Sequence, residues 1–180
     1  MYKGGFNMNA VERRKKIIEM LNIKKPLTGT FLSKNLMISR QVIVQDIAIL
    51  RAEGYGIVAT PQGYIIPDYS GKKCAKKIFA CIHSSEEIED ELKIIISMGG
   101  RVIDVYVEHP AYGEIRAMLM LSSIFDAEEF VRKLKESVGE PLLVLTKGVH
   151  LHTIEADDET KLKIIEDRLG KKGYLLNTDI

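Results

Sequence analysis

Two short amphipathic segments in the first third of the chain constrain the fold most strongly. Leu32 and Leu36 lie one helical turn apart, as do Ile43 and Ile47, so each segment presents one apolar face. Ser39 stands between them, where its hydroxyl can accept a hydrogen bond from a free backbone amide of the second helix. This spacing predicts two helices joined by a tight turn, which is a helix-turn-helix.

Polar side chains project from the first turns of the second helix, away from its apolar side. Arginine and glutamine can read guanine and adenine edges in a major groove. We therefore expect a recognition helix with DNA-binding residues Ser39, Arg40, Gln41, Val44 and Gln45. The alternative is an ordinary two-helix hairpin with a polar surface. Met37 departs from the pattern, because this turn position is often glycine and a left-handed backbone would cost about 1 kcal/mol.

A short hairpin is predicted directly after this helix. Residues 57–66 resemble two strands around a turn formed by Pro61, Gln62 and Gly63. A hairpin in this position is a wing, and Thr60 and Gln62 could reach the backbone or the minor groove of DNA. The sequence therefore predicts a winged helix-turn-helix domain over residues 9–70, which passes into a linker around residues 67–73.

Another helix is expected upstream, from about Asn9 to a point before Pro26, because the residue before a proline leaves the helical region. Residues 1–9 are expected to form a frayed tail. The basic side chains of this helix region either contact phosphates or form an ordinary solvated face. They are Arg13, Arg14, Lys15, Lys16 and Lys24.

Charge divides the chain at the same place as the sequence pattern. The net charge is only +1, yet residues 1–72 contain 11 lysines and arginines against 5 acidic residues. Residues 73–180 contain 15 against 20. A basic first part suits the neutralisation of phosphates, whereas DNA would repel the acidic second part.

Composition places the chain among globular proteins, with 46% hydrophobic and 28% charged residues. No apolar run approaches the ~20 residues that a membrane span needs, and the N-terminus lacks the apolar region of a signal peptide. The spacing of Cys74 and Cys81 matches no thiolate metal motif. These features favour a protein of the reducing cytoplasm, without a membrane partner.

The second part of the chain shows alternating strand and helix patterns. Strands are expected at residues 77–83, 101–107, 114–121 and 149–154, and helices at 84–98, 126–137 and 158–169, the last ended by Gly170. Residues 142–145 fit either a helical turn or a strand. The order β-α-β-β-α-β with one extra C-terminal helix predicts an α/β (α+β) domain of the split β-α-β, ferredoxin-like type over residues 74–176.

Three histidines and one acid in this domain have metal-ligand spacing. His150 and His152 lie two apart in a strand, so both point to one face with Cα atoms roughly 6.5–7 Å apart. His83 ends another strand of the same sheet, and Glu91 follows it in the adjoining helix. This set would suit zinc, nickel, iron or cobalt. The alternative is that the histidines are ordinary core or edge residues and Glu91 a surface acid.

Other candidates are weaker. Cys81 shares a strand face with His83 and is either a competing ligand or a small buried thiol. His109 precedes a proline in a turn, where a structural role or a place near a pocket rim is expected. Arg101, Arg116 and Lys147 are cations that could receive a carboxylate ligand. The chain contains no GxxxxGK[ST], GxSxG or HExxH motif, so we do not expect an enzyme.

Taken together, three strings resemble the niacin-responsive transcriptional repressors, whose sensor is called the three-histidine domain. The strings are residues 39–51 with Gly54-Tyr55 after them, residues 109–113 and, most specifically, Gly148-Val-His-Leu-His-Thr-Ile154, and Ile82-His83 also fits. The resemblance extends from about Asn9 to Gly173. The resemblance implies a repressor of NAD-biosynthesis or niacin-uptake genes that binds double-stranded operator DNA as a homodimer, with nicotinic acid as corepressor. It also implies a divalent metal, nickel or zinc before iron or cobalt, held by His83, Glu91, His150 and His152.

Two other functions remain open from the residues. One is a metal-sensing repressor, in which the ion and not niacin is the signal. The other is a metal-dependent enzyme joined to a DNA-binding domain, because a metal with an open coordination position can activate water for hydrolysis.

Overall fold

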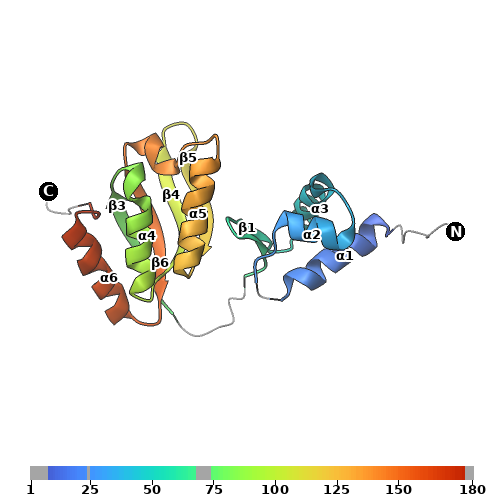
Figure 1. Cartoon of the computed structure of the whole chain (residues 1–180), viewed down its shortest axis with the longest axis horizontal. Coiled ribbons are helices and arrows are strands. Elements are labelled where there is room, and N and C mark those ends of the chain that lie inside the picture. Colours follow the sequence, from blue (N-terminus) through green and yellow to red (C-terminus); the bar gives the residue numbers. More distant parts are fainter. Residues whose placement is uncertain (1–7, 24, 68–73, 177–180) are drawn as a thin grey trace. The chain divides into compact units, whose positions relative to one another are not determined.

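The computed structural model describes residues 8–23, 25–67 and 74–176 (Figure 1). The chain divides into two compact units between residues 71 and 72. Residues 1–7 of the predicted tail, the basic Lys24 and residues 68–73 of the predicted linker lie outside the described residues.

The first unit contains three helices followed by a two-stranded hairpin. The elements are α1 (Ala10–Leu21), α2 (Gly29–Leu36), α3 (Arg40–Ala52), β1 (Val58–Thr60) and β2 (Gly63–Ile65). Asn9, Thr28 and Ser39 cap the three helices with their side chains. The apolar faces that the sequence predicted form one core, which includes Ile17, Leu21, Leu32, Leu36, Ile43, Ile47 and Leu50. The predicted helix-turn-helix with a wing is confirmed.

The turn between α2 and α3 adopts the left-handed backbone anticipated at Met37. Met37 has φ 53° and ψ 42°, and its side chain is 86% exposed. The turn is closed on both sides, because Ile38 N–H donates to the Ser33 carbonyl and the Ser33 hydroxyl donates back to the Ile38 carbonyl at 2.6 Å. The strained residue is therefore held by its neighbours and contributes little packing of its own.

Two of the basic residues of α1 are partly buried against α3. Arg13 donates to both carboxylate oxygens of Asp46 at 2.5 and 3.1 Å, and Arg14 lies 3.6 Å from the same carboxylate. Asp46 is buried in α3. These arginines join α1 to α3 and do not form the solvated face considered from the sequence.

The wing turn is compact. The Thr60 hydroxyl donates to the Gly63 carbonyl at 2.9 Å. The amide atoms of Gln62 are buried and have no hydrogen-bond partner within the described part of the chain. Gly63 has φ 135°, and a Cβ atom there would lie 2.5 Å from the Leu27 carbonyl oxygen. The polar side-chain atoms of Thr60 and Gln62 therefore lie within the wing and do not extend from it toward solvent.

The second unit contains the predicted strands and helices with shifted ends. They are β3 (Ala75–Ile82), α4 (Ile88–Ser97), β4 (Arg101–His109), β5 (Gly113–Leu121), α5 (Ile124–Glu136), β6 (Val149–Ala156) and α6 (Glu159–Lys172). Two short 3-10 helices are also present, η1 (Ser85–Glu87) and η2 (Leu142–Thr146), and η2 resolves the ambiguous segment. Gly170 lies inside α6, and the helix ends at Gly173, which takes the left-handed conformation with φ 78°.

The four strands form one antiparallel sheet in the order β3-β6-β4-β5. Because β3 and β4 both pair antiparallel with β6, they run parallel to each other with β6 between them. This confirms the split β-α-β arrangement. In a ferredoxin-like sheet the first strand is internal, whereas here β3 is an edge strand and the last strand is internal. Periodicity fixes the order of elements along the chain but not their lateral order, so the sequence pattern did not distinguish the two.

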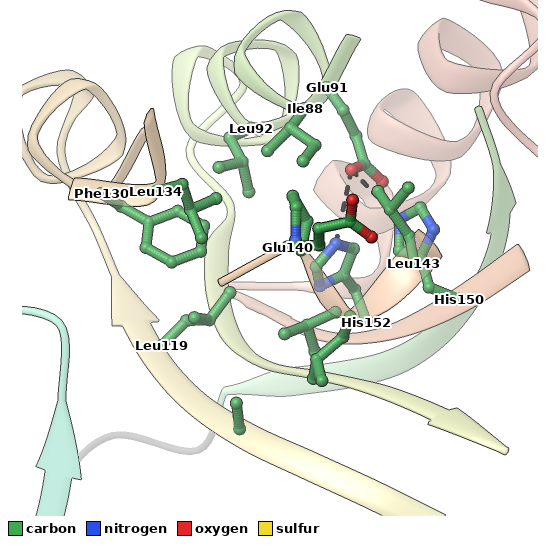
Figure 2. Close-up of a pocket in the computed structure, with 14 residues that line it drawn as sticks. Ile88, Glu91, Leu92, Leu119, Phe130, Leu134, Glu140, Leu143, His150 and His152 are labelled. Carbon is green, nitrogen blue, oxygen red and sulfur yellow. Dashed lines mark hydrogen bonds and ion pairs between the residues drawn. The ribbon is translucent and has the colours of Figure 1, made fainter. Parts of the chain in front are cut away.

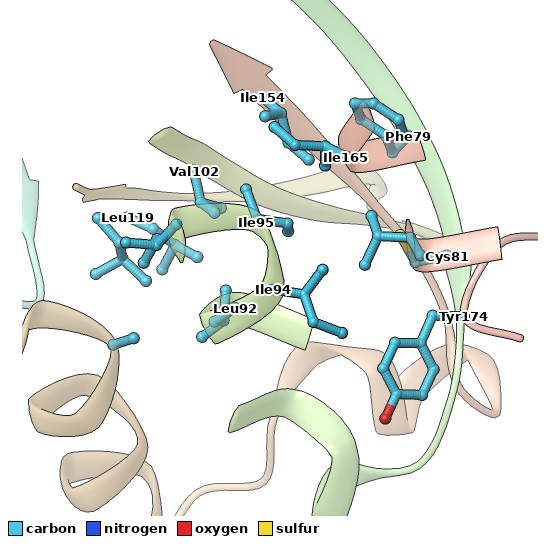
Figure 3. Close-up of a cluster of buried hydrophobic side chains, with 14 of the residues drawn as sticks. Phe79, Cys81, Leu92, Ile94, Ile95, Val102, Leu119, Ile154, Ile165 and Tyr174 are labelled. Carbon is cyan, nitrogen blue, oxygen red and sulfur yellow. The ribbon is translucent and has the colours of Figure 1, made fainter. Parts of the chain in front are cut away.

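Helices α4, α5 and α6 cover one face of this sheet (Figure 1). Alternate residues of β6 point toward them and are buried, which places His150 and His152 in line with Ile154. Figure 3 shows the resulting core, in which strand residues such as Phe79, Val102 and Ile154 meet Ile95 and Ile165 from the helices. Within the described ranges, no helix is long and apolar enough to cross a membrane.

Candidate metal centre and adjoining cavity

The four predicted metal ligands meet at one point of the second unit. His150 lies opposite Cys81 in the pairing of β6 with β3, and His83 follows directly after β3 on the face of Cys81. Glu91 stands in the first turn of α4. The split topology places β6 beside β3, and this neighbourhood brings residues 83 and 150 together from distant parts of the chain.

All three imidazoles direct Nε2 at the same carboxylate oxygen. The distance to Glu91 Oε2 is 2.8 Å from His83 and 3.4 Å from both His150 and His152. The ring centroids of His83 and His150 are 4.7 Å apart, and those of His150 and His152 are 5.0 Å apart. All four residues are buried, and Glu91 is only 1% exposed. Figure 2 shows three of these side chains, Glu91, His150 and His152.

The opposite ring nitrogens are fixed by backbone carbonyls. The Nδ1 atoms of the three histidines lie 2.6–2.8 Å from the carbonyl oxygens of Ser84, Gly148 and Asp104. A carbonyl can only accept, so each Nδ1 carries the proton and donates it. In the neutral ring the Nε2 lone pair is then free and aimed at the centre. This is the arrangement by which outer-shell hydrogen bonds prepare histidines to bind a metal.

Burial and charge act in opposite directions on these groups. Burial alone would raise the pKa of Glu91, but the charge of His152 and hydrogen bonds from the histidines hold that pKa well below its ordinary value. Burial alone would lower the pKa of His83 and of His152, but the hydrogen bond and charge of Glu91 raise the pKa of each above its ordinary value. The cluster therefore favours a carboxylate with compensating positive charge around it.

The donor set fits a divalent transition metal. Three imidazole nitrogens and one carboxylate oxygen are ligands that suit zinc, nickel, iron or cobalt. If the three Nε2 atoms carry no protons, their lone pairs all face the buried Glu91 carboxylate. A cation is then needed to compensate this negative charge. In addition, Glu91 Oε1 is buried and has no hydrogen-bond partner among the residues that the structure describes. Such an orphaned acceptor is expected where an ion belongs.

Cys81 adds a possible fifth donor. Its sulfur, a carboxylate oxygen of Glu91 and a ring nitrogen of His150 all lie within 4.8 Å of one another. Cys81 is completely buried, and burial together with the charge of Glu91 raises the pKa of its thiol. The Cys81 thiol is therefore buried in the core, and it also lies beside the predicted metal ligands. Both alternatives from the sequence describe its position.

A cavity of about 150 Å³ adjoins this centre (Figure 2). Glu91, His150 and His152 form one part of its lining, and Glu140 from the segment between α5 and η2 also lines it. The rest is largely apolar, with side chains from α4, β5, α5 and η2: Ile88, Leu92, Leu119, Phe130, Leu134 and Leu143. Sequence reasoning missed these residues, because their apolar spacing is indistinguishable from that of ordinary core residues.

None of the three cations considered for a carboxylate ligand lines this cavity. Arg101 pairs with Glu155 at 3.5 Å, and Arg116 pairs with Asp104 at 3.5 Å while its guanidinium lies 4.3 Å from the centre of the Tyr106 ring. Lys147 ends η2 in a left-handed conformation. They therefore take other roles in the unit.

His109 has the structural role expected of a turn residue. Its Nδ1 accepts hydrogen bonds from the backbone amides of Ala111 and Tyr112 at 3.1 and 3.3 Å. These bonds close the turn between β4 and β5. The fourth histidine is therefore not part of the histidine cluster.

In the first unit, the predicted DNA-binding residues lie at the exposed start of α3. The Ser39 hydroxyl accepts from the Val42 amide at 3.3 Å and caps the helix. The following polar face is solvent-exposed and comprises Arg40, Gln41, Val44 and Gln45. Because Asp46 is turned inward against Arg13, this face carries no acidic side chain that would oppose a phosphate.

Comparison with known proteins finds a different family for each of the two units. Residues 13–65 match a family of HTH domains, and residues 76–178 match the 3H domain. The chain is 48% identical to a probable transcription repressor NiaR of Thermotoga maritima, over 92% of this chain and 94% of that protein. It is 38% identical to the transcription repressor NadR of Bacillus subtilis, over 94% of this chain and 95% of that protein.

Both relatives are named as repressors, which confirms the expectation that the chain is not an enzyme. Their similarity extends over nearly the whole chain, through the helix-turn-helix and the sheet unit alike. The chain therefore belongs to the family of DNA-binding transcription repressors that combine an HTH domain with a 3H domain.

Proposed function

We propose that the chain represses genes of NAD biosynthesis or niacin uptake and that nicotinic acid, bound in the 3H domain, is its corepressor. The observation that supports this most directly is the cavity beside the histidine cluster. Apolar cavities of about 150 Å³ admit benzene, so a single six-membered ring matches this volume. A pyridine with one carboxylate combines such a ring with a group that a metal ion attracts.

The residues that would hold the metal are His83, Glu91, His150 and His152. The ion, nickel or zinc before iron or cobalt, would supply a positive charge and a coordination position for the ligand. The chain's own residues orient the ligand, because the three Nδ1 bonds to carbonyls fix the rings and the apolar wall excludes water from one side. Cys81 is placed to favour a thiophilic ion.

On the DNA side, α3 would enter the major groove of the operator. Arg40, Gln41, Val44 and Gln45 would face base edges and phosphates, with Ser39 at the start of the helix. A homodimer would present two such helices to a two-fold symmetric operator. The proposed site of action is the cytoplasm, where such operator DNA would lie.

The test is a titration of operator binding by the full chain. A duplex selected by the protein from a random pool would be measured with zinc-loaded and metal-stripped protein, each with and without nicotinic acid. Allosteric couplings are typically about 1–3 kcal/mol, so nicotinic acid should tighten binding by roughly 5- to 150-fold in the loaded protein. If nicotinic acid leaves the operator affinity of the zinc-loaded protein unchanged, the proposal is wrong.

A metal-sensing repressor is the second candidate, supported by the buried donor set with Cys81 beside it. In that case stripping the metal would change operator affinity at constant nicotinic acid, and adding the acid would change nothing. The same titration therefore separates the two functions.

A further inference from the structure

We infer that the cavity selects small planar monocarboxylates by the position of their charge, with the carboxylate at the histidine end and an uncharged ring against the apolar wall. In this arrangement Glu140 rejects ligands that carry a second negative charge. The inference rests on the proposed function, in that the cavity is taken as the ligand site. It adds the orientation of the ligand and the residue that sets its specificity.

The first step is the charge of the lining. Glu91 and Glu140 are acidic, and among the described residues that line the cavity none is a lysine or arginine. A carboxylate in a partly apolar cavity needs a positive partner, because an unpaired buried charge is costly. Among the described residues that line the cavity, His150 and His152 alone could hold a positive charge, in the form of the ion that these donors fit. The carboxylate therefore has one favourable position.

The second step is the shape of the wall beyond the cluster. Leu119, Phe130 and Leu134 lie across the cavity from His150 and His152 in Figure 2. This wall offers no hydrogen-bonding side chain to a ring nitrogen. A phenyl ring should therefore bind about as well as a pyridine ring, and the ring nitrogen should contribute little to affinity.

The third step concerns Glu140. It lines the cavity yet is solvent-exposed, which places it at the opening. Figure 2 shows Glu140 among the side chains that line the cavity. A ligand with two carboxylates would place one at the cluster and bring the other near this acid. Like charges at short range repel, so Glu140 disfavours such ligands.

The orientation is tested with two probes that each contain half of the recognition chemistry. Benzoate has the carboxylate without the ring nitrogen, and 3-methylpyridine has the ring nitrogen without the carboxylate. Calorimetry with the zinc-loaded full chain should show benzoate binding within about tenfold of nicotinic acid and 3-methylpyridine much more weakly. In the cobalt-loaded chain, benzoate should change the visible absorption of the ion. Tight 3-methylpyridine with no benzoate binding overturns the inference, as does a chain that binds neither.

The role of Glu140 is tested with benzene-1,3-dicarboxylate. The wild-type chain should bind it about tenfold or more weakly than benzoate, and Glu140→Gln should narrow that gap by at least about fivefold. Glu159→Gln, at the exposed start of α6, is the matched control and should keep the wild-type ratio. An unchanged ratio in Glu140→Gln overturns the specificity role. Loss of zinc affinity in Glu140→Gln also overturns it, because Glu140 would then be a ligand.

These results are separable from the proposed function. If benzoate binds and nicotinic acid leaves operator affinity unchanged, the orientation stands and the corepressor proposal fails. If nicotinic acid controls operator binding while 3-methylpyridine competes and benzoate does not, the corepressor proposal stands and the orientation fails.

Discussion

His152 illustrates how one backbone contact prepares a side chain for its chemistry. Its Nδ1 donates to the Asp104 carbonyl at 2.6 Å, and the Asp104 carboxylate in turn accepts from the Thr153 amide at 2.9 Å. The strand pairing of β4 with β6 therefore fixes the ring, and Nε2 is left to face Glu91. A histidine without such a contact would lose rotamer entropy on binding a metal.

Replacement of one histidine of the cluster should separate ligands from bystanders. His150→Ala removes one of the three converging nitrogens, whereas His109→Ala removes only a turn contact. Loss of an outer-shell partner already costs about 10–100-fold in metal affinity, so loss of a ligand should cost at least that much. Competition with a chromophoric chelator measures the affinity of zinc. Equal affinities of the two variants would contradict the assignment of the cluster.

Met37 provides a test of backbone strain at a single residue. Its left-handed conformation costs a non-glycine residue about 1–2 kcal/mol, and its exposed side chain loses little packing when removed. Met37→Gly should therefore raise the free energy of unfolding by up to about 1 kcal/mol in urea denaturation, after the entropic cost of glycine. Met37→Ala retains the strain and should show no gain. A glycine variant less stable than the alanine variant would refute this account.

At the scale of elements, α3 combines two opposed faces on one helix. Ile43, Ile47 and Leu50 pack into the core, and the buried Asp46 receives Arg13 from α1. The polar face is thereby held outward without a competing acid. Removal of the Asp46 side chain would leave a buried gap and take this partner from Arg13 and Arg14. The same residue therefore supports the packing of α3 and keeps negative charge off its exposed face.

The outward face of α3 should show base-specific behaviour in DNA binding. If Gln41 reads a base, Gln41→Ala should cost about 1–3 kcal/mol at one base pair of the operator and relax the preference there. A binding assay across all single-base operator variants measures this pattern. Lys15→Ala on α1 is the comparison, since a phosphate contact or a solvated lysine would change affinity evenly. A uniform loss from Gln41→Ala would identify it as a phosphate contact instead.

For the whole molecule, the buried cluster links stability to pH. The raised pKa values of His83 and His152 stabilise the folded metal-free chain fully below pH 6.5, and this stability is lost as the pH rises through their folded values. The lowered pKa of Glu91 stabilises above pH 4.5, and this contribution is lost only as the pH falls through its folded value. Both contributions are complete together between pH 4.5 and pH 6.5.

The metal-stripped chain should therefore lose unfolding free energy as the pH rises from about 6 to 8. Zinc should increase the unfolding free energy more at pH 8 than at pH 6, because fewer protons compete for the imidazoles at pH 8. At zinc concentrations about 100-fold above Kd the gain is about 2.7 kcal/mol. Denaturant titrations at each pH measure both effects. Glu91→Gln removes the charge that raises the histidine pKa values, and an unchanged slope in that variant would contradict the linkage.

Much of the molecule follows from local patterns that tertiary contacts do not override. The caps at Thr28 and Ser39 and the apolar spacing of α2 and α3 depend on neighbours within a few residues, so the helix-turn-helix was predictable. The two-residue spacing of His150 and His152 likewise fixes their common face. The end of α6 was predicted wrongly at Gly170, because a glycine is tolerated inside a helix and Gly173 has the left-handed geometry that ends it.

The tertiary structure alone decided what surrounds these residues. The position of β6 between β3 and β4, the inward turn of Arg13 to Asp46, and the meeting of Glu91 with His150 all join residues far apart in the chain. Periodicity specifies which face of an element is apolar, but not which other element covers it. The sequence by itself therefore determined the two kinds of unit and the candidate ligands, while long-range packing determined the cavity and the shared centre of the three imidazoles.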